Sequence, residues 1–276
     1  MTANVRSSVI SGKWYPGDPG RLKELIQNYI NQVDVQLSEG SVMGLVAPHA
    51  GYMYSGQVAA YGYKQILGKE YDLVVILSPM HQMYAGDLVV HSADFYETPL
   101  GQVPVDKELL LELEKQIELN YVPADGEHSL EIQLPFLQSV LKEFQILPLM
   151  MGLSDVSVCR EFSDILSKLL MNKNFLMIAS TDLHHISDYN EVVKRDKTVF
   201  EVLKSYDMKH ITTVLSSPGC SVCGRVPLTI MLETLNKMGA DQVKILKYSN
   251  SGDVTGEKQS GHYTVGYLSA AVIKSI

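Results

Sequence analysis

The chain has 276 residues, of which 46% are hydrophobic and 20% are charged, a composition typical of a globular protein that buries a core without disulfide staples. Its formal net charge of −8 and the lack of any basic run argue against a nucleic-acid partner, which requires clustered Lys and Arg. Three cysteines are too few for a disulfide framework, so we expect a reducing, cytoplasmic environment.

Short apolar runs recur along the chain, and most are continuous rather than alternating, which is typical of strands covered on both faces. All of them are too short to cross a bilayer, and the N-terminus has no apolar leader, so we expect no membrane role. The predicted strands are 42–47, 73–77, 87–91, 144–150, 175–179, 243–248 and 263–272.

Amphipathic stretches with apolar residues at helical spacing lie between several of these strands. The predicted helices are 56–67, 106–119, 130–142, 155–170, 189–203 and 227–238, with caps at Ser55, Asp106, Ser154 or Asp155, and Asp188. The alternation predicts one three-layer α/β domain over residues 1–276, with a mostly parallel central sheet flanked by helices. The strand at 87–91 follows its predecessor too closely for a helical crossover, so the sheet should be mixed. We expect residues 249–261 to form one long surface loop.

Histidines follow three of the predicted strands. His49 lies in Ala-Pro-His-Ala-Gly-Tyr, His81 follows Ser-Pro-Met, and His184 and His185 close Ser-Thr-Asp-Leu-His-His. Ligands of open α/β sheets bind beyond the carboxyl ends of the strands, so these loops should converge at one edge. Because imidazole is the commonest transition-metal ligand, the pattern predicts a site for Fe, Cu or Zn.

Cys220 and Cys223 form a Cys-x-x-Cys pair that has several interpretations. It fits a redox dithiol or half of a zinc site, but there is no second pair to complete a four-cysteine site. A helix starting near Pro227 would place Cys223 just before a helix N-terminus, which lowers a thiol pKa and favours the thiolate. Such a thiolate suits a metal ligand and equally suits a nucleophile.

Glu127 and His128 precede the amphipathic run that starts at residue 130. Either of them fits an acid–base or ligand-orienting role, and a structural role fits as well. Ser129 is a candidate cap for the helix, and Glu131 falls in its first turn, where an acidic side chain suits the helix dipole.

Taken together, these motifs resemble the Memo family. The matching pieces are 12–15 (Gly-Lys-Trp-Tyr), 47–52 (Ala-Pro-His-Ala-Gly-Tyr), 77–81 (Leu-Ser-Pro-Met-His), 127–131 (Glu-His-Ser-Leu-Glu), 180–185 (Ser-Thr-Asp-Leu-His-His) and 223–225 (Cys-Gly-Arg), and they span nearly the whole chain. The resemblance implies a fold like that of the class III extradiol dioxygenases, with a metal site at the strand ends. It also implies a functional link to a radical-SAM protein.

Carried over by position, the resemblance implies that His49, His81 and Cys223 bind the metal. It implies that His185 is the acid–base catalyst and that Asp182 lines the site. Two departures from the family pattern matter. His184 stands where histidine is not required, so either member of the His184–His185 pair is a candidate to face the site. Met80 and Gln82 flank His81 where relatives often have paired histidines.

Three functions are therefore compatible with the sequence. The first is a non-haem metal-dependent oxidoreductase, dioxygenase-like, that uses Fe(II) or Cu, or Zn, with Trp14 and Tyr54 lining an aromatic pocket. The second is a thiol hydrolase with Cys223 as nucleophile, His185 as base and Asp182 as orienting acid. The third is a binding or scaffold protein on the same fold. The expected ligand is a small molecule or peptide of unknown identity.

Overall fold

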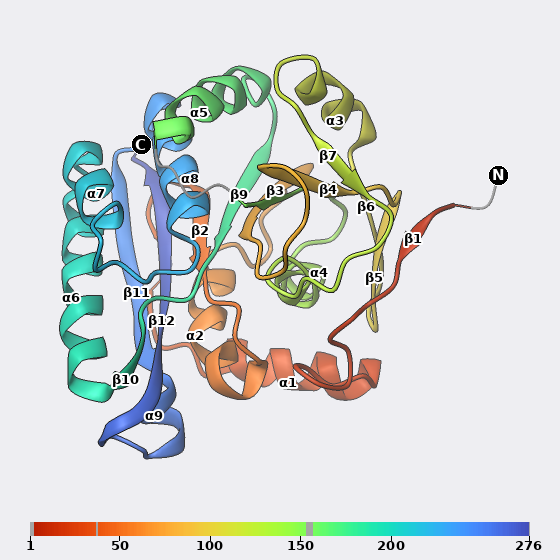
Figure 1. Cartoon of the computed structure of the whole chain (residues 1–276). Helices are drawn as coiled ribbons and strands as arrows, with labels where there is room; N and C mark the ends of the chain where they lie inside the picture. The colour runs from red at the N-terminus through yellow and green to blue at the C-terminus, as the bar shows by residue number, and fades with distance from the viewer. Residues whose placement is uncertain (1–2, 37, 153–156, 276) are drawn as a thin grey trace.

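The computed structural model describes residues 3–36, 38–152 and 157–275 (Figure 1). Its strands are β1 (Val5–Arg6), β2 (Ser41–Ala47), β3 (Leu73–Pro79), β4 (Leu88–His91), β5 (Phe95–Thr98), β6 (Gly101–Pro104), β7 (Asn120–Val122), β8 (Gln145–Met151), β9 (Phe175–Ser180), β10 (His185–Asp188), β11 (Gln242–Asn250) and β12 (Ser260–Lys274). Its helices are α1 (Pro19–Asn31), α2 (Tyr52–Lys64), α3 (Lys107–Glu114), α4 (Leu134–Val140), α5 (Ser157–Leu169), α6 (Tyr189–Ser205), α7 (Met208–Leu215), α8 (Arg225–Lys237) and α9 (Ser251–Thr255), with a 3-10 turn at Glu131–Gln133 before α4.

A large mixed sheet runs through the molecule in the order β10-β12-β2-β9-β3-β8-β4-β7, and β11 pairs with β12. The four central strands β2, β9, β3 and β8 are parallel, so their carboxyl ends meet at one edge. Strand β12 runs antiparallel to β2, and β4 runs antiparallel to β8. Strands β1, β5 and β6 form a separate small sheet.

Helices cover both faces of the large sheet, as alternate residues of β2 show. A Cβ built on Gly44 would meet Leu235 of α8, whereas Leu45, the next residue, lies against Gly62 of α2. Since successive strand residues point to opposite faces, α2 and α8 cover opposite sides. Helix α8 contacts α5 and α7, and α2 contacts α1 and α4, which completes the two outer layers.

The predicted fold class is confirmed: the chain forms a mixed α/β structure with a large central sheet between helices. Each of the seven predicted strands and six predicted helices has a counterpart in the structure. The caps at Asp106 and Asp188 are confirmed, since their side chains accept from Leu109 N and Glu191 N. Ser154 and Asp155, the alternative caps of α5, lie outside the described residues.

Other local predictions are wrong, and each has a physical reason. Helix α2 begins at Tyr52 rather than after Ser55, whose hydroxyl donates to Ala50 O. Ser129 does not cap a helix, because its hydroxyl donates to Pro79 O in the neighbouring strand. The expected loop at 249–261 contains the short helix α9, which the Asn250 side chain caps by accepting from Asp253 N. Among the described residues, no helix is both long and apolar enough to cross a membrane.

Candidate metal centre

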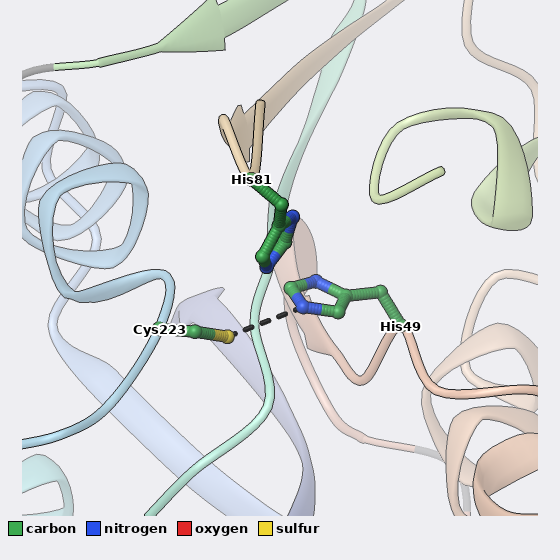
Figure 2. A group of neighbouring side chains, drawn as sticks. All are labelled: His49, His81 and Cys223. Carbon is green, nitrogen blue, oxygen red and sulfur yellow. Dashed lines mark hydrogen bonds between the residues drawn. The ribbon is translucent and has the colours of Figure 1, made fainter. Parts of the chain in front are cut away.

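Three side chains from distant parts of the chain converge where the parallel strands end. His49 follows β2, His81 follows β3, and Cys223 lies two residues before α8. Each offers one donor atom, and these atoms all lie within 4.8 Å of one another. Figure 2 shows the three side chains pointing toward a common centre, with Cys223 Sγ 3.2 Å from His49 Nε2. Two imidazoles and a sulfur at this spacing are a ligand set for a transition metal.

Gly224 allows Cys223 to approach the sheet. A Cβ at this position would lie 2.4 Å from Thr181 Cβ and 2.6 Å from Ser180 O, so only glycine fits here without a shift. The Gly224 N–H donates to Thr181 Oγ1 at 2.9 Å, and the Asp182 N–H donates to Cys223 Sγ at 3.2 Å. The residues after β9 therefore hold the start of α8, and the sulfur with it, beside His49.

His49 is buried, and both its backbone N–H and its ring make hydrogen-bond contacts. Its N–H donates to Asp182 Oδ1 at 2.8 Å, and its Nδ1 lies 3.1 Å from Ser180 Oγ. With Nδ1 occupied in this way, Nε2 is the nitrogen that faces Cys223. Burial, with the nearby His81 and His128 imidazoles, lowers the pKa of His49 well below its usual value. The ring is therefore neutral at physiological pH, as a metal ligand must be.

Glu127 orients His81. Its carboxylate accepts from the His81 N–H at 2.6 Å and lies 2.8 Å from His81 Nδ1. Burial favours the protonated acid, but the hydrogen bonds from His81 outweigh it and lower the pKa of Glu127 to about 2. A carboxylate that holds Nδ1 of a histidine leaves Nε2 for a metal, an arrangement common around metal sites.

His128 lies against the same group. Its ring stacks on His81 with centroids 4.5 Å apart, and its Nδ1 is 3.3 Å from Glu127 Oε1. Donor atoms of His81, Glu127 and His128 also lie within 4.8 Å of one another. Burial and the neighbouring His81 lower the pKa of His128 to about 4, so this ring too is neutral at physiological pH.

The prediction of a low thiol pKa at Cys223 is wrong. Burial raises the pKa of Cys223 well above its ordinary value, and the negative charge of Asp182 raises it further. Burial also raises the pKa of Asp182, to about 7, although Asp182 accepts N–H groups from His49 and Ala50. The helix N-terminus stabilises the thiolate, but burial of the sulfur destabilises the thiolate by more. A bound cation would reverse this balance, because a coordinated thiol loses its proton.

A cavity of about 730 Å³ opens beside these groups. His49, His81, His128 and Asp182 are among the residues that line it. Its walls are largely aromatic and include the predicted pocket residues Trp14 and Tyr54; the tyrosines that the sequence did not single out are Tyr15, Tyr29, Tyr52, Tyr263 and Tyr267. Trp14 lies 4.3 Å from His128, centroid to centroid.

The structure separates the two members of the His184–His185 pair. His185 lines the cavity, its Nδ1 is 3.1 Å from Tyr263 OH, and its Nε2 is buried with no hydrogen-bond partner among the described residues. His184 is buried away from this cavity against Asp196. The hydrogen bonds described for His185 go to Tyr263 and Ser221, and not to the Cys223 and Asp182 that the hydrolase hypothesis requires.

A family profile described as "Memo-like protein" matches residues 6–271. The chain therefore belongs to the Memo family. Relatives described as MEMO1 family proteins include one from Nitrosopumilus maritimus at 32% identity, over 95% of this chain and 98% of its own. Another, from Thermotoga neapolitana, is 35% identical over 96% of this chain and 99% of its own. A third, from Methanosarcina mazei, is 35% identical over 98% of both chains.

A solved structure shares the fold of this Memo-family chain. It is the crystal structure of an uncharacterised Escherichia coli K12 protein, which superposes with a TM-score of 0.55 and 14% identity. The match covers 84% of this chain and all of the other. At this identity the likeness concerns the fold alone.

In this Memo-family member, sequence reasoning missed the role of Glu131. Glu131 does lie in the first turn of a helix, as predicted, but its side chain is also fully buried and accepts hydrogen bonds from the N-terminal segment. The donors are Arg6 Nη1, Ser8 Oγ, Val9 N, Ile10 N and Tyr15 OH. The network fixes the segment that leads into Trp14 and so builds one cavity wall. An acidic residue inside an otherwise apolar stretch was the available signal.

Proposed function

We propose that this protein binds a transition-metal ion, Fe(II) or Cu in the first place and Zn as the alternative, between His49, His81 and Cys223. The observation that carries the proposal is that the three donor atoms lie within 4.8 Å of one another. Two imidazoles and one sulfur, each positioned by hydrogen bonds, fit such an ion. A thiolate in place of a carboxylate favours soft ions such as copper and zinc alongside iron.

We further propose that the protein is a metal-dependent oxidoreductase, related in its chemistry to the class III extradiol dioxygenases, whose fold the Memo family resembles. A redox-active ion, when bound, would supply electron transfer and open coordination positions for small ligands. The chain's own residues would perform the remaining tasks. The aromatic walls would hold an apolar small molecule or peptide side chain and exclude water from the ligand residues.

His185 is the candidate proton carrier of this proposal. It lines the cavity, and its Nε2 has no hydrogen-bond partner among the described residues. Tyr263 OH, 3.1 Å from Nδ1, fixes the direction of the ring. Burial lowers the pKa of His185, so the imidazole is a base at neutral pH and accepts a proton at Nε2. Asp182, which also lines the cavity, accepts the backbone N–H of His49 and so orients that residue.

The metal proposal is tested by elemental analysis of protein purified without added metal. We expect about one ion per chain in the wild type and a loss of most of it in the His49→Ala, His81→Ala double variant. A matched control removes two exposed imidazoles, His210→Ala and His262→Ala, and should keep the ion. Equal metal content in the wild type and the first double variant would exclude the site.

The oxidoreductase proposal has its own test. Oxygen uptake is followed with a panel of catechols after loading the protein with Fe(II) or Cu, and His185→Gln is compared with the wild type. We expect uptake by the loaded wild type and a loss of a hundredfold or so in the variant, the usual contribution of a general acid–base group (about 10²–10⁴). A metal-loaded protein that takes up no oxygen with any of these substrates would reject this activity and leave the metal-binding proposal unaffected.

The cytoplasmic location and the link to a radical-SAM protein stay predictions.

A further inference from the structure

A buried carboxylate lies next to the segment that carries His185 into the cavity. It belongs to Asp196 of α6, whose side chain is fully buried. The hydrogen bonds described for it come from an imidazole, a backbone N–H and a phenol. Because desolvating a carboxylate is costly, a chain that keeps one at such a position gains something from these contacts.

Asp196 holds His184 at two points. Its Oδ1 accepts the His184 N–H at 3.1 Å and lies 2.8 Å from His184 Nδ1. Its Oδ2 accepts from the hydroxyl of Tyr248, on β11, at 2.9 Å, so both carboxylate oxygens are engaged. The backbone and the ring of His184 are therefore both tied to one buried group on α6.

Strand β12 also holds His184, through Gly266. The Gly266 N–H donates to His184 O at 3.0 Å, and Gly266 O accepts from the Leu183 N–H at 2.8 Å. A Cβ at position 266 would overlap the Asp196 carboxylate, so glycine here leaves the room that the carboxylate needs. The N–H, the carbonyl and the ring of His184 are thus all engaged.

The next residue, His185, has weaker contacts of its own. Its N–H donates to Ser221 Oγ at 3.4 Å, which is long for a hydrogen bond. Its Nδ1 lies 3.1 Å from the hydroxyl of Tyr263, a residue that is 64% exposed. It pairs with Val265 at the first position of the short strand β10. The direction in which its ring enters the cavity therefore depends on the firmly held residue before it.

We propose that Asp196 is a positioning residue for His185 and acts through His184. By fixing the backbone and the ring of His184, it sets the direction in which the following side chain points into the cavity. The proposal rests on the proposed function for the role of His185 as proton carrier. The placement of the His185 ring is measurable without any activity.

The positioning depends on an acceptor oxygen and not on the negative charge, and two variants separate these properties. Asp196→Asn keeps an oxygen that accepts from His184 and loses the charge. Asp196→Ala loses both the oxygen and the charge. We therefore expect His185 to be placed as in the wild type in the first variant and to be released in the second.

The first measurement is a nitrogen NMR spectrum of the full-length chain with isotopically labelled histidine, in which His185→Gln identifies the signals of His185. A neutral ring held in one tautomer has two well-separated nitrogen shifts, and a ring that exchanges between tautomers averages them. We expect separated shifts in the wild type and in Asp196→Asn, and averaged shifts in Asp196→Ala. Asp164→Ala, which removes an exposed carboxylate of α5, is the control and should leave the shifts unchanged.

The second measurement is oxygen uptake by the metal-loaded protein. A misplaced proton carrier lowers kcat more than it changes KM, so we expect a loss in kcat of about tenfold or more in Asp196→Ala and less than about threefold in Asp196→Asn. In a His185→Gln background, Asp196→Ala should cause no further loss of kcat, because the side chain that Asp196 positions is already gone. A merely structural role would lower kcat in both backgrounds.

Unchanged His185 shifts in Asp196→Ala overturn the proposal, and so do equal effects of Asp196→Ala and Asp196→Asn. If Asp196→Ala does not fold, amide hydrogen exchange of the wild type decides. The His184 N–H, bonded to the buried carboxylate, should exchange about tenfold more slowly than the His185 N–H, or slower still. Equal rates at the two positions overturn the proposal. A metal-loaded protein without oxygen uptake would reject the oxidoreductase proposal instead, and the nitrogen shifts would then decide this one.

Discussion

The Glu127 carboxylate holds His81 at two points, accepting from its backbone N–H at 2.6 Å and lying 2.8 Å from its ring Nδ1. The ring is about one-third exposed, and its orientation depends on this contact. Glu127 itself has a fully buried side chain, and its pKa of about 2 keeps it ionised throughout the physiological range. The position of one candidate ligand is thus set by a buried negative charge.

We predict that Glu127→Gln weakens metal binding about 10- to 100-fold, the usual effect of losing an orienting carboxylate. Trp14, the single tryptophan, lies 4.3 Å from the His128 ring, so quenching of its fluorescence by added Co(II) gives the binding curve. Glu191→Gln, on the surface of α6, is the control and should bind as the wild type does. Unchanged affinity in Glu127→Gln would show that His81 is positioned by other contacts.

We predict that Gly224→Ala is destabilising by about 1–3 kcal/mol, because the added methyl would overlap Thr181 and the carbonyl of Ser180. The shift should also move Cys223 away from His49 and reduce metal content. Urea unfolding measures the first effect, and elemental analysis measures the second. Gly20→Ala in the exposed part of α1 is the matched control and should change stability by less than about 0.5 kcal/mol. A stable, metal-loaded Gly224→Ala would contradict the packing argument.

We predict that Glu131→Ala costs about 3–5 kcal/mol, since it leaves the Arg6 guanidinium buried with a lost partner and removes four further acceptor contacts. The comparison is Glu191→Ala, which removes a surface ion pair with Arg195 and should cost less than about 1 kcal/mol. Chemical denaturation of both variants gives the difference. Equal costs would mean that the buried network contributes no more than a surface pair.

We predict a pH-dependent loss of stability that depends on Asp196. Folding raises the pKa of His184 from its ordinary 6.5 to about 9, so the stabilisation is fully present below pH 6.5 and is lost as the pH rises through 9. The free energy of unfolding lost over this pH range is about 3 kcal/mol at most. The groups that face His184 are Asp196 and Cys220, and Tyr248 holds the far side of the carboxylate. Urea unfolding between pH 6 and 9.5 should show this slope in the wild type and a flatter one in Asp196→Asn.

The fold was largely predictable because the central strands can be recognised from their own residues. Strands β3 and β9 are buried along their whole length and read as continuous apolar runs. Elements without such a pattern were missed. Helix α1 was not predicted, although Asp18 followed by Pro19 is a typical helix start and Asp18 does accept from Arg21 N. The two-residue strand β1 depends on pairing with β5, which lies about 90 positions away in the chain.

The residues of the candidate site could be predicted from the sequence, but the pKa values of their side chains could not. Strand ends and the family resemblance pointed to His49, His81 and Cys223, and the structure brings these three together. The thiol pKa at Cys223 depends on how deeply the sulfur is enclosed and on the distance to Asp182, neither of which a local pattern contains. The separate surroundings of His184 and His185 likewise follow from the placement of α6 and of Tyr263.

Arg6 connects the first residues of the chain to the far side of the candidate centre. Its guanidinium donates to Glu131, to Asp125 and to the backbone carbonyl of Glu127. A truncation that removes Arg6 would therefore disturb the loop that carries the His81-orienting carboxylate, without touching any candidate ligand. Metal or activity measurements on a protein that lacks its first residues through Arg6 would therefore report on a disturbed His81, even though all three candidate ligands are present.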